Sequence, residues 1–414
     1  MTRLARWLAI LYVVLLPVGR SGLPMNAQWG DLVLPVLAVA ATREQPLGRW
    51  WRAQDWPLAL YLLVTLVTAL ISAEPSAGLK HLAKQLSVAL VFVVFRQLTA
   101  DAALTRTLAK TFVLTVAAVT LASVPVVFLR PWPGFVPALL GASATLPFLG
   151  LVGRLRGGFL TPEMLGNALL VAFVLALALR AGRSGGARAA WTAVATILAA
   201  GEFLTFSHSV AGFAVTAVLF VFRAGPSRPG RYLAWSAAIA VVVTVNAASL
   251  VEPGPAANDY GVGPVSFQVM GARVHGELIH YAALKQTAWS SFLDHPLTGL
   301  GPGQFGRETE RAFQEGRFNA RYRNKPPQCD LMGRLAESGI LGGLSLLLLW
   351  GSWLRAGPAL STRSAMQSAA LTAVVGLLVN SVNADVMNFR FLWLAAAWAS
   401  WPEAPPDEAS APNA

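Results

Sequence analysis

Charged residues and cysteine are both scarce in this sequence of 414 residues. Asp, Glu, Lys and Arg make up 13% of the chain, whereas a soluble protein usually carries roughly a quarter. The single cysteine, Cys329, excludes an intramolecular disulfide framework and a zinc site built from several cysteines. No spacing of His, Asp and Glu resembles a metal-binding motif, and no cofactor is expected. With 55% hydrophobic residues in many long runs, the chain belongs to the membrane class.

The net charge of +12 is spread along the chain. Arginines punctuate the apolar stretches, which does not fit the clustered basic face of a nucleic-acid-binding protein. No nucleic-acid partner is therefore expected, and membrane lipids are expected to surround much of the chain. The sequence shows no internal repeat at a fixed period.

About twelve apolar stretches approach the roughly 20 residues that a helix needs to cross a bilayer. They predict an all-α fold, a polytopic membrane protein with about 12 transmembrane helices. The second and the last stretches are the shortest. The spans are expected near residues 6–22, 28–42, 57–73, 82–98, 108–129, 162–180, 189–206, 209–223, 231–251, 335–354, 365–382 and 386–402.

The links between these spans predict the orientation, because basic residues collect on the cytoplasmic side. If the N-terminus lies inside, sixteen basic residues fall in inside links and four in short outside links. The inside set is Arg3, Arg6, Arg43, Arg49, Arg52, Arg96, Arg106, Lys110, Arg180, Arg183, Arg188, Arg223, Arg228, Arg231, Arg355 and Arg363; the outside set is Arg20, Lys80, Lys84 and Arg390. Both termini are therefore predicted to be cytoplasmic.

This topology leaves two long segments on the outer side. Residues 130–161 are rich in proline and glycine and are predicted to form an amphipathic or re-entrant element at the interface. Residues 252–334 form a loop of about eighty residues between helices 9 and 10, and loops of that length tend to be functional. Apolar residues at three- and four-residue steps predict a helix over 276–294. The predicted domains are helices 1–9 at 1–251, the large loop at 252–334, helices 10–12 at 335–402 and a disordered tail at 403–414.

Three motifs lie in or beside the large loop. They read DHPLTGLGPGQF at 294–305, AESGILGG at 336–343 and NADVMNFRFLW at 383–393. Together with the span number, they resemble the O-antigen ligase and O-antigen polymerase superfamily. Its pattern has a dHPl-G-G-pg-F element, a large periplasmic loop and a P-H-N/S-x-x-L-x-x-L-x-E-x-G-x-x-G element that enters a membrane helix.

This resemblance implies a multi-pass glycosyltransferase of the bacterial inner membrane with a periplasmic active face. The enzyme would move a glycan from undecaprenyl pyrophosphate to a hydroxyl of lipid A-core, without a metal and with inversion at the anomeric carbon. Polymerisation of O-antigen or exopolysaccharide, with a growing polysaccharide as acceptor, is the alternative within the superfamily. A non-catalytic polysaccharide-export partner or a transporter is the alternative of another class.

One departure from the superfamily pattern concerns the histidine thought to activate the acceptor hydroxyl. Gln328 stands there, and a glutamine orients a hydroxyl but cannot act as a general base. Either Asp330 takes that role, or another histidine such as His275, His280 or His295 does, or the protein is inactive. A fourth alternative needs no strong base, because a pyrophosphate is already an activated leaving group. The predicted catalytic residues are Gln328, Asp330 and His280.

Basic residues near these motifs are candidates for binding phosphate, for which arginine supplies a planar fork. Those of 321–325 have no acidic neighbours in the sequence, whereas 307–317 is more typical of a solvated helix with pairs such as Glu308–Arg311 and Glu310–Gln314. In the superfamily the turn after span seven often carries an arginine, and His208 stands there. The predicted substrate-binding residues are Arg154, Arg156, Arg273, Lys285, Arg321, Arg323, Lys325 and His208.

Other ionisable groups are predicted to be structural. Asp385 and Arg390 bracket the entry to the last span and are expected to form a salt bridge. Glu337 lies in the first turns of its predicted helix, where the positive end of the helix dipole is expected to stabilise a carboxylate. His81, close to Lys84, is expected to lie at the membrane interface and not in a site.

Overall fold

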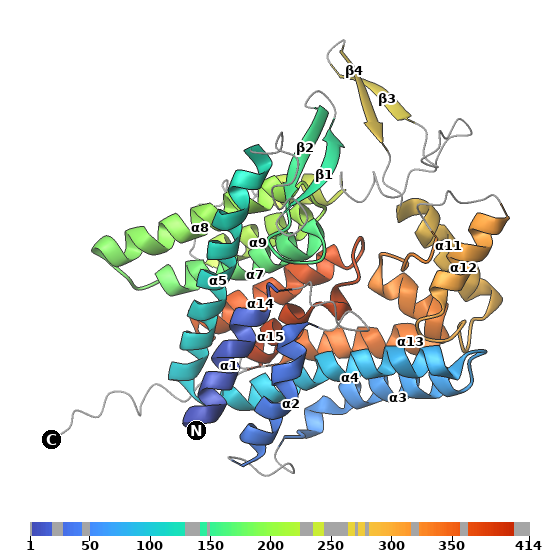
Figure 1. The fold of residues 1–414 in the computed structure, drawn as a ribbon, viewed down its shortest axis with the longest axis horizontal. Coiled ribbons are helices and arrows are strands. Elements are labelled where there is room, and N and C mark those ends of the chain that lie inside the picture. The colour runs from blue at the N-terminus through green and yellow to red at the C-terminus, as the bar shows by residue number, and fades with distance from the viewer. Residues whose placement is uncertain are drawn as a thin grey trace.

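The computed structural model (Figure 1) describes residues 2–18, 28–43, 50–128, 141–146, 150–223, 235–243, 264–269, 272–277, 281–315, 323–356 and 363–400. The described chain is mostly helical, which confirms that part of the prediction. The predicted tail at 403–414 lies outside the described residues. The helices are α1 (Arg3–Leu15), α2 (Trp29–Thr42), α3 (Trp56–Leu70), α4 (Pro75–Leu98), α5 (Ala102–Phe128), α7 (Pro162–Arg180), α8 (Gly185–Thr205), α9 (Val210–Arg223), α11 (Tyr281–Asp294), α12 (Phe305–Gln314), α13 (Asp330–Arg355), α14 (Ala365–Asn380) and α15 (Arg390–Ala399), with short 3₁₀ turns η3 (Ala53–Asp55) and η5 (Val386–Asn388).

Four helices of the described chain are long and apolar enough to cross a membrane: Pro75–Leu98, Ala102–Pro125, Pro162–Arg180 and Asp330–Arg355. Several shorter apolar helices accompany them. Large apolar side chains remain exposed on the outer faces of α2, α3 and α13, among them Val36, Leu63, Val67, Leu344 and Leu348. An apolar surface of this extent is typical of a protein that contacts lipid.

Two β-hairpins depart from the all-α prediction. Strands β1 (Gly141–Leu146) and β2 (Gly150–Leu155) pair antiparallel, as do β3 (Pro264–Val269) and β4 (Ala272–Glu277). The segment predicted to be amphipathic or re-entrant therefore contains a hairpin, and the helix predicted from residue 276 begins at Tyr281. Apolar residues at every second position of β3, Val265, Phe267 and Val269, are a strand signal that the sequence analysis did not use.

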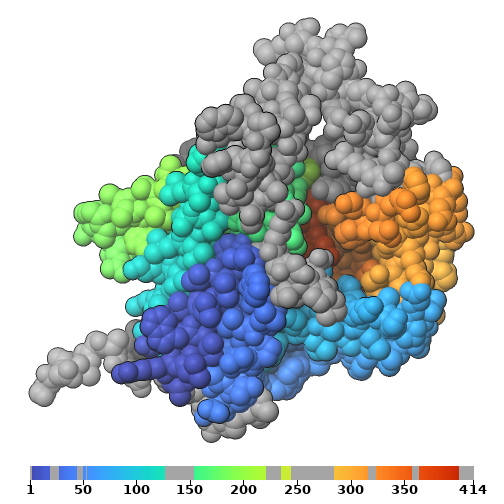
Figure 2. Space-filling view, in the orientation of Figure 1, coloured from blue at the N-terminus to red at the C-terminus, as the bar shows by residue number. Residues whose placement is uncertain are grey.

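The helices pack around α7 and α15, which are buried along almost their whole length. Helix α7 contacts α5, α8, α9 and α14, and α15 contacts α4 and α14. Helices α3, α4 and α13 lie side by side (Figure 1). The α11–α12 region, orange in Figure 2, covers one end of the α3–α4 pair, where Arg307 of α12 forms an ion pair with Glu74.

Buried ion pairs join helices that are distant in sequence. Arg96 of α4 pairs with Asp55 and also donates to the carbonyl of Trp50 at 2.6 Å. Arg390 pairs with Asp31 of α2, with Nε and Oδ1 2.7 Å apart. The predicted Asp385–Arg390 salt bridge is therefore wrong: α2 lies against the start of α15 and supplies a carboxylate that no local pattern reveals.

Helix α13 is broken at Gly339, and the loop after α11 fills the break. Gly339 has φ 65° and ψ −163°, so the amide of Ile340 turns away from the helix and donates to the carbonyl of Pro296 at 2.8 Å. The carbonyl of Ala336 thus loses its helical donor. It accepts instead from the amide of Leu300, and the carbonyl of Glu337 accepts from the amide of Gly301, both at 2.9 Å. The DHPLTGLGPGQF and AESGILGG motifs are therefore two halves of one backbone interlock.

Replacing Gly339 by alanine should destabilise the protein by roughly 2 kcal/mol or more, because a side chain is strained at this φ. A Cβ there would also lie 2.3 Å from the carbonyl oxygen of Leu297. Thermal unfolding of the full chain in detergent measures the effect. Gly351→Ala is the matched control, since a Cβ at this position of α13 meets nothing within 4 Å and should leave the midpoint unchanged or slightly higher. Equal midpoints for the two variants would contradict the interlock.

Candidate functional site

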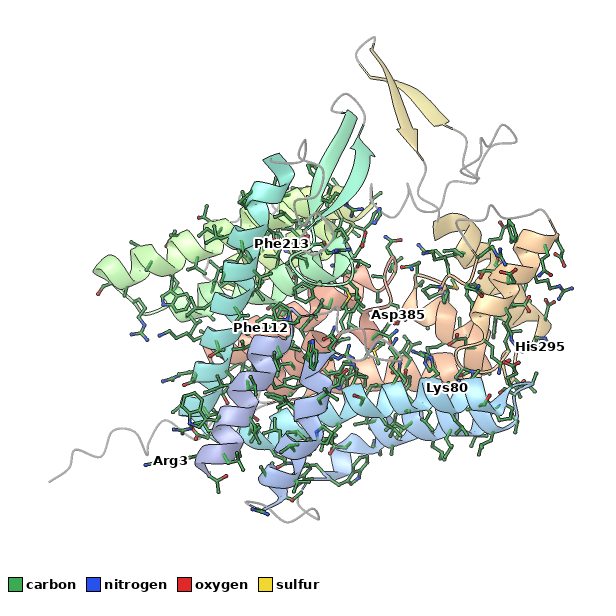
Figure 3. All side chains as sticks on the ribbon, viewed as in Figure 1. Arg3, Lys80, Phe112, Phe213, His295 and Asp385 are labelled. Carbon is green, nitrogen blue, oxygen red and sulfur yellow. The ribbon has the colours of Figure 1, made fainter. Side chains whose placement is uncertain are left out.

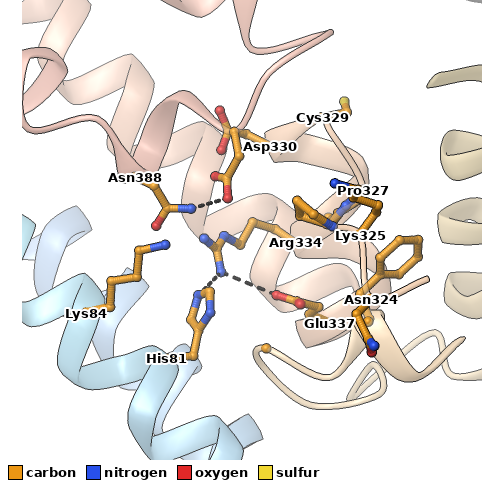
Figure 4. Close-up of a pocket in the computed structure, with 16 residues that line it drawn as sticks. His81, Lys84, Asn324, Lys325, Pro327, Cys329, Asp330, Arg334, Glu337 and Asn388 are labelled. Atoms are coloured by element: carbon orange, nitrogen blue, oxygen red, sulfur yellow. Dashed lines mark hydrogen bonds and ion pairs between the residues drawn. The ribbon is translucent and has the colours of Figure 1, made fainter. Parts of the chain in front are cut away.

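A cavity of about 210 Å³ lies where the interlock meets α4 and the turn before α15 (Figure 4). Its walls come from five parts of the chain. They are His81 and Lys84 of α4; Gly303, Phe305 and Gly306 at the start of α12; Asn324, Lys325, Pro326, Pro327 and Cys329 of the segment before α13; Asp330, Gly333, Arg334 and Glu337 of α13; and Asp385 and Asn388 around η5.

Arg334 lies at the centre of this cavity, with only 4% of its surface exposed. Its Nη1 contacts Nε2 of His81 at 2.7 Å and lies 3.7 Å from a carboxylate oxygen of Glu337. Its guanidinium also lies over the ring of Tyr61, 5.6 Å from the centroid. Glu337 accepts hydrogen bonds from the backbone amides of Gly303 and Phe305. The interlock therefore fixes Glu337, and Glu337 helps to fix Arg334.

The contact with Arg334 sets the hydrogen-bonding state of His81. An arginine nitrogen only donates, so Nε2 of His81 must accept and must be free of hydrogen. The side-chain amide nitrogen of Gln85, 3.4 Å away, approaches the same Nε2. Two hydrogen bonds orient Gln85. The hydroxyl of Tyr61 donates to Oε1 of Gln85 at 3.1 Å, and Nε2 of Gln85 donates to Oδ1 of Asn388 at 3.2 Å. His81 is thus a neutral imidazole whose basic nitrogen faces Arg334.

Asp330 is an anchor of the fold. Its carboxylate accepts from the amides of Val386 at 2.9 Å and Met387 at 3.3 Å, which ties α13 to η5. It also shares a hydrogen bond with the carboxyl group of Asp385, and two carboxyl groups can form one only around a shared proton. These contacts leave the predicted role of Asp330 as a base without support from the geometry.

Asp385 is the ionised member of this carboxyl pair. Burial raises the pKa of Asp385, but the hydrogen bond with Asp330 and the charges of Lys84 and Arg334 outweigh burial, so its pKa lies below the usual value. Asn388 also donates to Asp385. The pair therefore contributes about one negative charge to the cavity wall.

Two lysine side chains add positive charge to the cavity wall. Lys84 and Lys325 line it, and among the described residues neither has an ion pair within 4 Å. Together with Arg334 they place three cations around a space whose other charges are Glu337 and the carboxyl pair. Burial raises the pKa of the Cys329 thiol, so this group stays protonated near neutral pH and is not a nucleophile.

The segment before α13 holds an uncommon backbone conformation. Asn324 and Gln328 both have φ 54°, on either side of Pro326-Pro327. Residues without glycine's freedom occupy this region rarely, and such strain clusters at functional sites. Lys325 of this segment lines the cavity, whereas Gln328 is half-buried beside it and is not among the lining residues.

Arg323 is engaged elsewhere. Its Nε and Nη2 contact the two carboxylate oxygens of Glu310, both at 2.8 Å, and its guanidinium lies 4.9 Å from the ring centroid of Phe313. The assumption that Arg323 has no acidic neighbour is therefore wrong, because the fold brings α12 back against this segment. The hydrogen bond from Arg323 lowers the pKa of Glu310. The expected Glu310–Gln314 contact is present at 3.3 Å.

The remaining predicted residues lie outside the cavity or outside the described chain. Lys285 of α11 is buried, donates to Asn383 at 2.7 Å, and has a pKa lowered by burial. Arg273 belongs to β4, opposite Gln268. His280 and Arg321 lie outside the described residues.

Arg154, Arg156 and His208 lie around a different part of the fold, between β2, α7 and the turn from α8 to α9. Arg154 donates to the carbonyl of Thr205 at 2.7 Å and pairs with Glu163 at 3.0 Å. Arg156 is buried close to the start of α7. None of these three residues lines the cavity.

His81 and Lys84 are the functional candidates that sequence analysis misjudged. A signal was present, since His81, Lys84 and Gln85 follow one another at helical steps just before the long apolar run of this helix. Polar groups in such a helix usually face the interior of a bundle. No protein-family model and no curated protein matches the chain. The resemblance noted above therefore rests on the motifs alone.

The stability of the protein should depend on His208 in mildly acidic solution. Burial lowers the pKa of His208 from 6.5 to about 4, so the folded chain resists a proton that the unfolded chain accepts. The resulting stability is fully present above pH 6.5 and is lost as the pH falls toward 4; it amounts to at most roughly 3 kcal/mol. Thermal unfolding of the full chain between pH 4.5 and 7.5 should show a weaker pH dependence for His208→Gln than for the wild type. His295→Gln, at an exposed histidine, should keep the wild-type slope; an identical slope for His208→Gln would contradict this role.

Proposed function

We propose that this chain is a multi-pass glycosyltransferase of the bacterial inner membrane. It transfers a glycan from undecaprenyl pyrophosphate to a hydroxyl of lipid A-core at the periplasmic face, in the manner of an O-antigen ligase. The topology proposed with it has about twelve spans, both termini in the cytoplasm, and the cavity at the outer side. The sixteen-to-four distribution of basic residues and the three motifs support this arrangement.

The observation that carries the proposal is the cationic cavity beside the motifs. Two of the motifs form the interlock that holds Glu337 and Arg334, and the third supplies Asp385 and Asn388. Lys84, Lys325 and Arg334 converge on a space that suits a diphosphate, whose oxygens prefer charge-assisted donors. The cavity of about 210 Å³ has room for the diphosphate and the sugar attached to it, while the lipid tail and the rest of the glycan extend outside.

The chemistry proposed for this site depends on stabilising the leaving group. As the bond from the anomeric carbon to the phosphate oxygen breaks, the diphosphate gains negative charge. The cations around the cavity stabilise this charge in the transition state. The acceptor hydroxyl attacks from the opposite face of the sugar, which inverts the anomeric configuration.

A deletion strain tests the function. Loss of long glycans from the cell surface, with carrier-linked glycan accumulating, is the expected result. Loss of polymer length with single repeat units still attached to lipid A-core would identify a polymerase instead. Unchanged surface glycans with altered uptake of a small solute would refute the transferase and indicate a transporter.

Replacing Lys84 and Lys325 by glutamine tests the cavity itself. Each lysine should contribute a charge-assisted hydrogen bond of about 1.5–3 kcal/mol, so each single variant should weaken undecaprenyl pyrophosphate binding by roughly 10- to 100-fold. Binding to the full chain in nanodiscs measures the effect. Lys80→Gln is the matched control, because Lys80 lies one turn before Lys84 on α4 and is exposed (Figure 3). Wild-type affinity in both cavity variants, at normal thermal stability, would rule out this cavity as the diphosphate site.

A further inference from the structure

The proposed transfer needs an acceptor for the proton of the attacking hydroxyl, and the residues of the P-P-Q-C-D segment do not provide one. Gln328 has no titratable proton and is not among the cavity-lining residues. Both carboxylate oxygens of Asp330 accept hydrogen bonds from the amides of η5, and the carboxyl group shares a proton with Asp385. Among the described residues that line the cavity, His81 is the histidine.

In the structure, the basic nitrogen of His81 is blocked by a hydrogen bond. Its Nε2 carries the lone pair, and that lone pair is occupied by Nη1 of Arg334 at 2.7 Å. The same guanidinium is the cation closest to the ring, and it lies in the cavity where a diphosphate would bind (Figure 4). An arginine that turns toward phosphate oxygens, which it prefers to a neutral imidazole, would expose Nε2.

We propose that His81 is the general base of the transfer, and that Arg334 keeps its Nε2 covered until the donor diphosphate draws the guanidinium away. This inference rests on the proposed function of the same site. In the step, the hydroxyl O–H bond breaks and its proton moves to Nε2, while the oxygen forms a bond to the anomeric carbon. The bond from that carbon to the diphosphate oxygen breaks, and the electron pair leaves with the diphosphate. The imidazolium afterwards returns its proton to the diphosphate or to water.

The charged and titratable groups around His81 agree with this order of events. Arg334 and Glu337 of α13 and Lys84 of its own helix line the cavity with it, as do Asp385 before η5 and Lys325 before α13. Tyr61 of α3 contacts two of its neighbours, Arg334 and Gln85. Without a donor, the cations Arg334 and Lys84 oppose a positive charge on the ring. A bound diphosphate compensates them, so a proton on the ring then faces an anion. Donor binding therefore precedes acceptor activation, and a hydroxyl that enters an empty cavity is not activated.

The competing interpretation is that His81 only positions Arg334. His81→Gln separates the two roles, because glutamine offers an acceptor oxygen to Arg334 but has no basic nitrogen. The full chain is assayed in membranes that retain the strain's own carrier-linked glycan and acceptor, and undecaprenyl pyrophosphate binding is measured in nanodiscs. His295→Gln serves as the matched control, since this exposed histidine lies outside the cavity.

We expect His81→Gln to lower the transfer rate at least 100-fold, within the range that general bases contribute, while the affinity for undecaprenyl pyrophosphate changes less than threefold. The wild-type rate should fall in acid as Nε2 is protonated, and this acid limb should be absent from the residual activity of His81→Gln. A variant that transfers within threefold of the wild type, that keeps the same acid limb, or that loses diphosphate binding would overturn the base assignment and leave the proposed function standing. If the wild type binds no undecaprenyl pyrophosphate and transfers nothing, the proposed function itself fails, and the base assignment with it.

Discussion

The exchange of backbone hydrogen bonds at Gly339 is the constraint on which the rest of the site depends. Within a membrane, a carbonyl that loses its helical donor has no water to replace it, so irregular backbone is tolerated only where protein covers it. Here the amides of Leu300 and Gly301 donate to the carbonyls of Ala336 and Glu337 at the break. The same loop then brings the amides of Gly303 and Phe305 to the carboxylate of Glu337. These hydrogen bonds between the loop and α13 therefore help to position Arg334 in the cavity wall.

The buried charges divide into two groups with different consequences. Arg96 with Asp55 and Arg390 with Asp31 are closed pairs in which each guanidinium is matched by a carboxylate. Such pairs contribute little net stability, but removing one partner is costly. In the cavity the match is incomplete, since Lys84 and Lys325 lack ion pairs among the described residues. A surplus of cations around the cavity favours binding of an anion.

The sequence predicted much of the helical framework, but not which residues line the cavity. Apolar run lengths indicated the helices, and the three motifs marked the chain segments that meet at the cavity. The two β-hairpins were not predicted, because the alternation of apolar and polar residues in their strands extends over only six residues. His81 and Arg390 were misjudged for another reason: their partners, Arg334 and Asp31, lie 253 and 359 residues away. Periodicity describes neighbours along one element, whereas these contacts depend on which helices pack together.

The ion pair between Asp31 and Arg390 also has a bearing on biogenesis. The ribosome produces α2 long before α15, because the partners are 359 residues apart. During that interval the carboxylate of Asp31 has no guanidinium to meet, and an uncompensated charge is unfavourable in a lipid environment. The early helices must therefore stay near the insertion machinery, or hold Asp31 at the water boundary, until α15 arrives. Closure of this pair would mark the docking of α15 against α2.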